Sequence, residues 1–182
     1  APMNFCSDNV AGASPEIIQA LSDANTGPAT PYGDDDITQR VIGRLRDLFE
    51  TDAEILFMST GSSANALALA TMTPPYGSVY CHPDSHVNVD ECGAPEFFTG
   101  GAKLVTVPGT DGKMSPEALE NAITGAGVVH HTQPAAVSVT QVTEAGTLYT
   151  LDKLAAIAEI CRAHRLKLHM DGARFANAVE AL

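Results

Sequence analysis

The most informative segment of this chain is Leu166-Lys167-Leu168-His169-Met170-Asp171-Gly172-Ala173-Arg174-Phe175. It predicts a buried strand that ends in a carboxylate, with a guanidinium three residues later. An open α/β sheet carries its reactive groups at the carboxyl ends of its strands. An Asp held there can keep a cofactor ring nitrogen protonated, and the Arg can hold a substrate carboxylate through two hydrogen bonds. The alternative is a structural ion pair between the two, since an acid at the end of an apolar strand is costly unless paired.

Outward from this segment, short apolar runs alternate with helical patterns. This alternation predicts a three-layer α/β/α sandwich whose sheet is mainly parallel. Strands are expected at 53–58, 78–81, 103–107, 135–140 and 166–170. Helices are expected from Ser14 and Pro15, across 37–49 and 63–71, from Ser115, over 150–163 and from Ala173. We assign residues 1–14 to an irregular arm and 15–182 to one domain.

The composition is that of a globular protein, with 45% apolar residues, 18% charged residues, 15 Gly and 11 Pro. A net charge of −12 disfavours nucleic acid and anionic membranes as partners. No apolar run approaches the length needed to cross a membrane. The four cysteines form no Cys-x-x-Cys pair, so we expect reduced thiols in a cytoplasmic protein and place Cys161 in the core.

Met58-Ser59-Thr60-Gly61-Ser62-Ser63-Ala64-Asn65 predicts a glycine turn that opens a helix. The unpaired N–H groups at such a helix start favour an anion such as phosphate. The alternative is that Ser62 or Ser63 is only a helix cap. The segment lacks the Gly-Lys-Ser/Thr of a nucleotide P-loop and the Gly-x-Gly-x-x-Gly of a dinucleotide site.

The remaining polar clusters allow more than one interpretation. His82 and His86, with Asp90 and Glu91, could be metal ligands, but Pro83 breaks the segment and the histidines lack one-turn helical spacing, so we predict no metal site. His86 could equally stack on a flat cofactor, and His82 is expected to be a surface loop residue. His130 and His131 are also expected in a loop, and His164 near the C-terminus of a helix. Tyr32-Gly33-Asp34-Asp35-Asp36 is expected to form a turn with acidic residues that cap the following helix.

Together these segments resemble the threonine aldolase branch of the fold-type I pyridoxal phosphate (PLP) enzymes, within the β-eliminating lyases. The resemblance extends over nearly the whole chain and is closest to the low-specificity L-threonine aldolases. It rests on Ser7-Asp8-Asn9, Tyr32-Gly33-Asp34-Asp35, Thr60-Gly61-Ser62, His86 with Asp90-Glu91, Gly93-Ala94-Pro95-Glu96, Thr140-Gln141 and His169-Met170-Asp171-Gly172-Ala173-Arg174.

The resemblance implies a PLP-binding large domain with assigned cofactor contacts. Asp171 would bind the pyridine nitrogen, and His86 would stack on the ring with Glu91 near it. Gly61 and Ser62 would cradle the phosphate.

The resemblance also implies substrate contacts. Ser7 and Arg174 would bind the substrate α-carboxylate, and Arg174 would also contact the cofactor. Tyr32 would approach the phosphate or the substrate, either in its own subunit or in a neighbouring one. His86, Asp171 and Arg174 are therefore the expected catalytic residues.

The implied reaction is retro-aldol cleavage of a β-hydroxy-α-amino acid, namely threonine, allo-threonine or phenylserine, to glycine and an aldehyde. Many members carry a second histidine where this chain reads Thr143-Glu144, which leaves the base for the hydroxyl proton open. The family's Schiff-base lysine follows the Asp-Gly-Ala-Arg motif on the next strand, and Lys103, Lys113, Lys153 and Lys167 do not match it. We therefore expect no turnover from these 182 residues alone, with the lysine segment and a small C-terminal domain absent.

As an intact enzyme the protein would be a homodimer or homotetramer with active sites shared between subunits. Two alternatives stay open: another fold-type I lyase or aminotransferase, and a non-catalytic fragment that needs a complementary chain.

Overall fold

The computed structural model describes residues 10–182. The chain divides into two compact units, Ala1–Leu56 and Phe57–Leu182. Ser7 and most of the predicted arm over residues 1–14 lie outside the described residues, and that arm stays a prediction.

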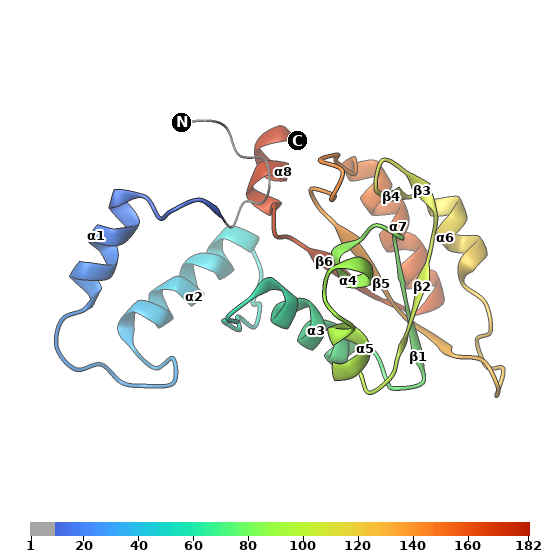
Figure 1. Cartoon of the computed structure of the whole chain (residues 1–182), viewed down its shortest axis with the longest axis horizontal. Helices are drawn as coiled ribbons and strands as arrows, with labels where there is room; N and C mark the ends of the chain where they lie inside the picture. Colours follow the sequence, from blue (N-terminus) through green and yellow to red (C-terminus); the bar gives the residue numbers. More distant parts are fainter. Residues whose placement is uncertain (1–9) are drawn as a thin grey trace. The chain divides into compact units, whose positions relative to one another are not determined.

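The second unit contains a sheet of four parallel strands in the order β2-β1-β5-β6 (Figure 1). The strands are β1 Gly77–Cys81, β2 Lys103–Thr106, β5 Gln133–Thr140 and β6 Lys167–Asp171. A short antiparallel pair, β3 Gly109–Thr110 with β4 Lys113–Met114, follows β2. Parallel register places Thr140 of β5 beside Asp171 of β6, so both strands deliver their last residues to one edge of the sheet.

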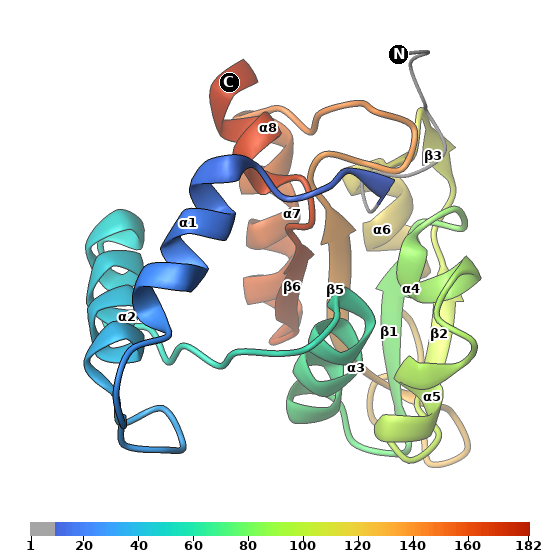
Figure 2. The ribbon, with the colours of Figure 1, turned by 60° about the vertical axis from the view of Figure 1, so that its left-hand side comes forward.

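Helices cover both faces of this sheet (Figures 1 and 2). On one face lie α3 Gly61–Met72, α4 His86–Val89 and α5 Ala94–Phe98, and on the other α6 Pro116–Ala122 and α7 Leu151–His164. The chain closes with α8 Phe175–Ala181, after β6.

The alternation of side chains along β1 separates two cores. Val79 and Cys81 pack with Leu69 of α3, whereas Tyr80 packs with Leu119 of α6 and Ile157 of α7. This arrangement confirms the predicted three-layer sandwich. Cys161 also belongs to the α6/α7 core, as predicted, and burial raises the pKa of its thiol to about 11.

The helix starts follow ordinary capping chemistry. Ser115 and Thr150 accept hydrogen bonds from the backbone N–H groups of Ala118 and Lys153, which satisfies donors that a helix start leaves unpaired. The sequence alternative in which Ser62 or Ser63 caps α3 was wrong, because the N-cap residue is Thr60. The Thr60 hydroxyl accepts a hydrogen bond from Ser63 N at 3.1 Å. The Ser63 hydroxyl returns a bond with Thr60 N at 3.2 Å, completing a capping box.

The first unit consists of α1 Pro15–Ala24 and α2 Asp36–Phe49. Asp35 caps α2 by accepting from Ile37 N and Thr38 N, which confirms the predicted acidic cap. Ser14 is the N-cap residue of α1, as predicted, although its side chain makes no capping hydrogen bond. Neither helix contains a buried residue within the described part of the chain.

The predicted strand at 53–58 was wrong. The segment is irregular, and Leu56 and Phe57 are exposed. Alternating apolar residues favour an extended chain, but a strand needs a neighbour for its N–H and C=O groups. The described strands offer this segment no pairing. The other predicted strands are present with boundaries shifted by one or two residues, and no described helix is long and apolar enough to cross a membrane.

Candidate active site

Asp171 is the last residue of β6, and its carboxylate is held inside the carboxyl edge of the sheet. One oxygen, Oδ1, accepts from Ala173 N at 3.0 Å, and the other, Oδ2, accepts from Asn65 Nδ2 at 2.9 Å. The residue is only 9% exposed. The backbone bond comes from the turn that Gly172 begins, so strand end and turn together orient the carboxylate.

Asn65 joins this carboxylate to a second one. Its Nδ2 also donates to Glu91 Oε1 at 2.8 Å, so both N–H bonds of one amide point at carboxylates. The side chain of Glu91 is completely buried, and its Oε2 has no hydrogen-bond partner within the described residues. Because a buried carboxylate is costly without donors, Asn65 is required to keep these two acids close together.

His86 completes the network at the solvent side. Its Nδ1 lies 2.9 Å from Glu91 Oε1, and since a carboxylate only accepts, Nδ1 carries the proton. The hydrogen bond that His86 donates to Glu91 raises the pKa of His86, against the opposing effect of partial burial. The side chain remains 43% exposed, so a ligand can reach the ring while Nδ1 is fixed.

The N-terminus of α3 lies on the same helix that carries Asn65. Thr60 caps Ser63 N, and Ala64 N bonds to Thr60 O, which leaves the N–H groups of Gly61 and Ser62 without acceptors in the described structure. A Cβ built on Gly61 meets no atom within 4 Å, so the space in front of this helix start is open. These donors and the helix dipole suit a phosphate group.

Arg174 and Asp171 do not form an ion pair in the described structure, so the structural alternative for these two residues was wrong. Arg174 instead donates from Nε to Val142 O at 3.2 Å. This bond leaves both terminal nitrogens of the guanidinium available for a carboxylate.

Glu144 lies beside His86. Its Oε1 accepts from the His86 backbone N at 2.8 Å and from the Thr140 hydroxyl at 3.1 Å. Its Oε2 has no partner within the described residues, and the residue is exposed. An anchored carboxylate with one open oxygen is suited to accept a proton.

Residues 4–182 match the family described as beta-eliminating lyase. The chain belongs to that family. It is 45% identical to a low specificity L-threonine aldolase from Pseudomonas sp. (strain NCIMB 10558), over 96% of this chain and 50% of that protein. Thus the chain spans about half the length of the curated relatives it matches.

Solved structures agree with the fold. A threonine aldolase from Leishmania major superposes with a TM-score of 0.91 at 32% identity, covering 98% of this chain and 52% of that one. Serine palmitoyltransferase from S. paucimobilis, solved with bound PLP, has a TM-score of 0.62 at 22% identity, covering 86% of this chain and 37% of that one. The fold is therefore that of the fold-type I enzymes, as expected.

Within this lyase fold, the structure gathers Asp171 and His86 into one network with Glu91. Gly61 and Ser62 lie at the start of the helix that supplies Asn65. Tyr32 lies in the first unit, in a turn with a φ of 65°, and is fully exposed. The sequence interpretation missed Asn65. Its polar side chain inside the apolar run 64–72 was the available signal, because an amide there needs a partner.

The prediction for His82 as a surface residue was wrong, since it is only 5% exposed. Its Nδ1 accepts from Asp84 N at 3.2 Å, so Nε2 carries the proton and faces Gly109 O at 3.4 Å. Local backbone partners thus make burial of the ring possible. His130 and His131 lie in a loop as predicted, and His164, near the end of α7, pairs with Glu120 at 2.8 Å.

No group of three or more His, Cys, Asp or Glu among residues 10–182 is placed to hold a metal ion. None of the four lysines bonds to Asp171, Asn65, Glu91 or His86 in the described structure. Lys103 and Lys167 are the first residues of β2 and β6, at the opposite edge of the sheet, and Lys153 lies on α7. Lys113 donates its Nζ to Leu148 O at 3.3 Å.

Replacing Asn65 tests the shared amide. We expect Asn65→Ala to lower the free energy of unfolding by about 1–3 kcal/mol, because two buried carboxylates lose a donor. Asn88→Ala removes a single exposed bond to Pro83 O and should change stability by less than about 0.5 kcal/mol. Urea unfolding of both variants measures the difference, and equal losses would contradict the bridging role.

Replacing Glu91 tests the pKa of His86. We expect Glu91→Gln to lower that pKa, because Glu91 is the main cause of its elevation. Asp90→Asn should lower it less, since Asp90 contributes least. NMR titration of the His86 ring measures both changes. A His86 pKa that does not respond to Glu91→Gln would refute the assigned pair.

The raised pKa also has a consequence for stability. A histidine whose folded-state pKa exceeds its unfolded value stabilises the protein fully below about pH 6.5, and this contribution is lost as the pH rises through the folded pKa. Glu91→Gln should therefore flatten the dependence of stability on pH above about 6.5.

Proposed function

We propose that the whole protein is a PLP-dependent aldehyde-lyase that cleaves a β-hydroxy-α-amino acid, such as threonine or phenylserine, to glycine and an aldehyde. The main observation behind this proposal is the network Asp171–Asn65–Glu91–His86, which joins a buried carboxylate at a strand end to a partly exposed imidazole ring. The similarity to L-threonine aldolases supports it.

The residues present fit PLP. Asp171 offers a buried carboxylate to a protonated ring nitrogen, and the ring of His86 offers a surface for stacking. Gly61 and Ser62 offer backbone donors to the phosphate. When bound, PLP supplies an electron sink for the pair released as the Cα–Cβ bond breaks.

The chain's own side chains would then divide the remaining work. Asp171, held by Asn65 and Ala173 N, keeps the proton on the ring nitrogen. Arg174 binds the substrate carboxylate through its terminal nitrogens, and the bond from its Nε to Val142 O fixes the direction of the guanidinium.

Glu144 is our proposed base for the β-hydroxyl proton. Two hydrogen bonds anchor its Oε1 next to His86 and leave Oε2 open. Because His86 N donates to Glu144, the position of the Glu144 carboxylate depends on the same segment that carries the His86 ring. Glu144 therefore takes the role that the sequence left unassigned.

None of the four lysines bonds to Asp171, Asn65, Glu91 or His86 in the described structure, so we expect the amine that binds PLP covalently to come from another part of the whole protein. Residues 1–182 alone should then give no turnover. We also propose a cytoplasmic homodimer or homotetramer, with Ser7 and Tyr32 as further substrate-binding residues, from the same subunit or its neighbour.

The reaction is tested by incubating the full-length protein with L-threonine and with phenylserine. We expect glycine with acetaldehyde or benzaldehyde in equal amounts, and loss of at least about a hundredfold in kcat/KM for Asp171→Asn, which removes the charge facing the ring nitrogen. A 2-oxo acid or free ammonia as the product would instead indicate an aminotransferase or a β-eliminating reaction.

Glu144→Gln tests the proposed base. Gln keeps an oxygen for His86 N and Thr140, but it cannot take a proton, so kcat should fall by roughly 10²–10⁴ while the absorption spectrum of the bound cofactor is unchanged. Asp84→Asn, an exposed acid outside the network, should leave kcat unchanged. Retention of full activity in Glu144→Gln would eliminate Glu144 as the base.

A further inference from the structure

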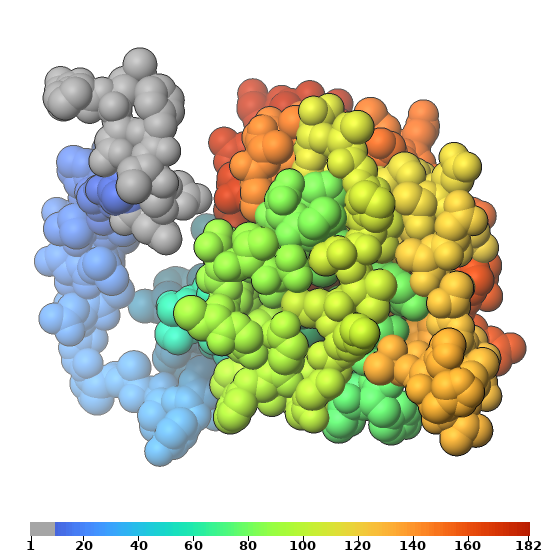
Figure 3. Space-filling view, turned by 45° about the vertical axis from the view of Figure 1, so that its right-hand side comes forward, coloured from blue at the N-terminus to red at the C-terminus, as the bar shows by residue number. Residues whose placement is uncertain are grey.

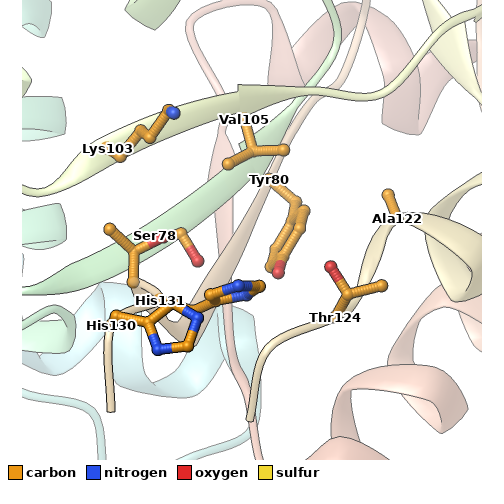
Figure 4. Close-up of a pocket in the computed structure, with 9 residues that line it drawn as sticks. Ser78, Tyr80, Lys103, Val105, Ala122, Thr124, His130 and His131 are labelled. Atoms are coloured by element: carbon orange, nitrogen blue, oxygen red, sulfur yellow. The ribbon is translucent and has the colours of Figure 1, made fainter. Parts of the chain in front are cut away.

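A hollow lies in the Phe57–Leu182 unit, on the other face of the sheet from the Asp171–Asn65–Glu91–His86 network. Ser78 and Tyr80 are two residues apart on β1, as are Lys103 and Val105 on β2, so all four side chains face α6. The hollow has a volume of about 330 Å³ and is lined by Ser78, Tyr80, Lys103, Val105, Ala122, Thr124, His130, His131 and Thr132 (Figure 4). This volume lies at the lower end of small-molecule sites.

Tyr80 supplies the observation that points to a ligand. The residue is 2% exposed and its ring belongs to the α6/α7 core, yet its hydroxyl has no hydrogen-bond partner within the described residues. Figure 4 shows this hydroxyl directed toward the space between His131 and Thr124. The hydroxyl reaches the open space of the hollow, where a ligand would accept a hydrogen bond from it.

The other polar groups around the hollow are mainly donors. The Lys103 ammonium and the Thr124 hydroxyl have no partner within the described residues, and the lining contains neither Asp nor Glu. His130 and His131 pack edge to face at 4.9 Å, with no hydrogen bond to either ring in this part of the chain. In a chain of net charge −12, a lining with a cation and without carboxylates selects for an anion.

The loop that carries the two histidines is held in a defined shape. Gln133, the first residue of β5, accepts from Gly127 N at 2.8 Å and donates to the carbonyl oxygens of His131, Val128 and Gly125. A Cβ on Gly125 would lie 2.6 Å from His131 Nδ1, so only glycine allows this approach. The loop projects from the surface of this unit (yellow-orange, lower right in Figure 3).

We propose that this hollow binds the oxyanion group, phosphate or carboxylate, of a small metabolite. Tyr80, Thr124 and a histidine would donate to the oxygens, and Lys103 would balance the charge. The proposal is independent of the lyase activity, because the hollow shares no residue with the network around Asp171 and faces the opposite helices.

Isothermal titration of the PLP-loaded, full-length protein with inorganic phosphate, and separately with succinate, tests the proposal. Loading with PLP occupies the helix start at Gly61, where phosphate would otherwise compete. We expect saturable binding of at least one probe, and the stronger of the two identifies the anion class. Tyr80→Phe should weaken that binding by about tenfold or more, since it removes one hydrogen bond to a charged group.

Tyr80→Phe also separates binding from folding. Because the hydroxyl has no protein partner in the described structure, its removal should leave the urea midpoint unchanged or raise it. Lys103→Gln should weaken binding about two- to fivefold. Tyr76→Phe and Lys153→Gln change the same residue types outside the hollow and should have no effect on binding.

Two results would overturn the proposal. One is the absence of saturable binding for both probes. The other is binding that Tyr80→Phe and Lys103→Gln leave at wild-type affinity, which would place the anion elsewhere. A protein that binds the probe but lacks lyase activity would refute only the proposed function.

Discussion

The amide of Asn65 is the contact on which the site depends. Two carboxylates, Asp171 and Glu91, are taken out of water within reach of one side chain, and each accepts one of its two N–H bonds. Carboxylates buried together repel each other and lose hydration, so donors between them are needed to hold the arrangement. Asn65 has no third N–H bond, and Glu91 Oε2 is left without a partner in the described structure.

The same helix connects this contact to the expected phosphate position. Thr60 fixes the first residue of α3, and Asn65 is the fifth residue of the helix. Gly61 and Asn65 are four residues apart, so they share one face, and the Asn65 side chain leans back toward the helix start. A change in the start of α3 would therefore move the backbone donors of Gly61 and the amide of Asn65 together.

Most of the sheet could be predicted from local sequence, because each strand is a short apolar run bounded by turns and helix caps. The predicted strand at 53–58 was wrong because strand formation depends on a neighbouring strand, and a local sequence pattern carries no information about one. The prediction that His82 lies at the surface was wrong for a related reason, since the burial of this ring depends on the backbone groups of Asp84 and Gly109. The bridge from Asn65 to Asp171 joins residues 106 positions apart, so neither segment alone predicts it.

The alternation of side chains along β1 places different residues on the two faces of the sheet. Val79 and Cys81 pack with Leu69 of α3, while Ser78 and Tyr80 line the hollow on the α6 side. A shift of one residue in this strand would exchange the two sets and place Tyr80 against Leu69. The buried side chains of β1 thus lie between the Asn65 network and the hollow.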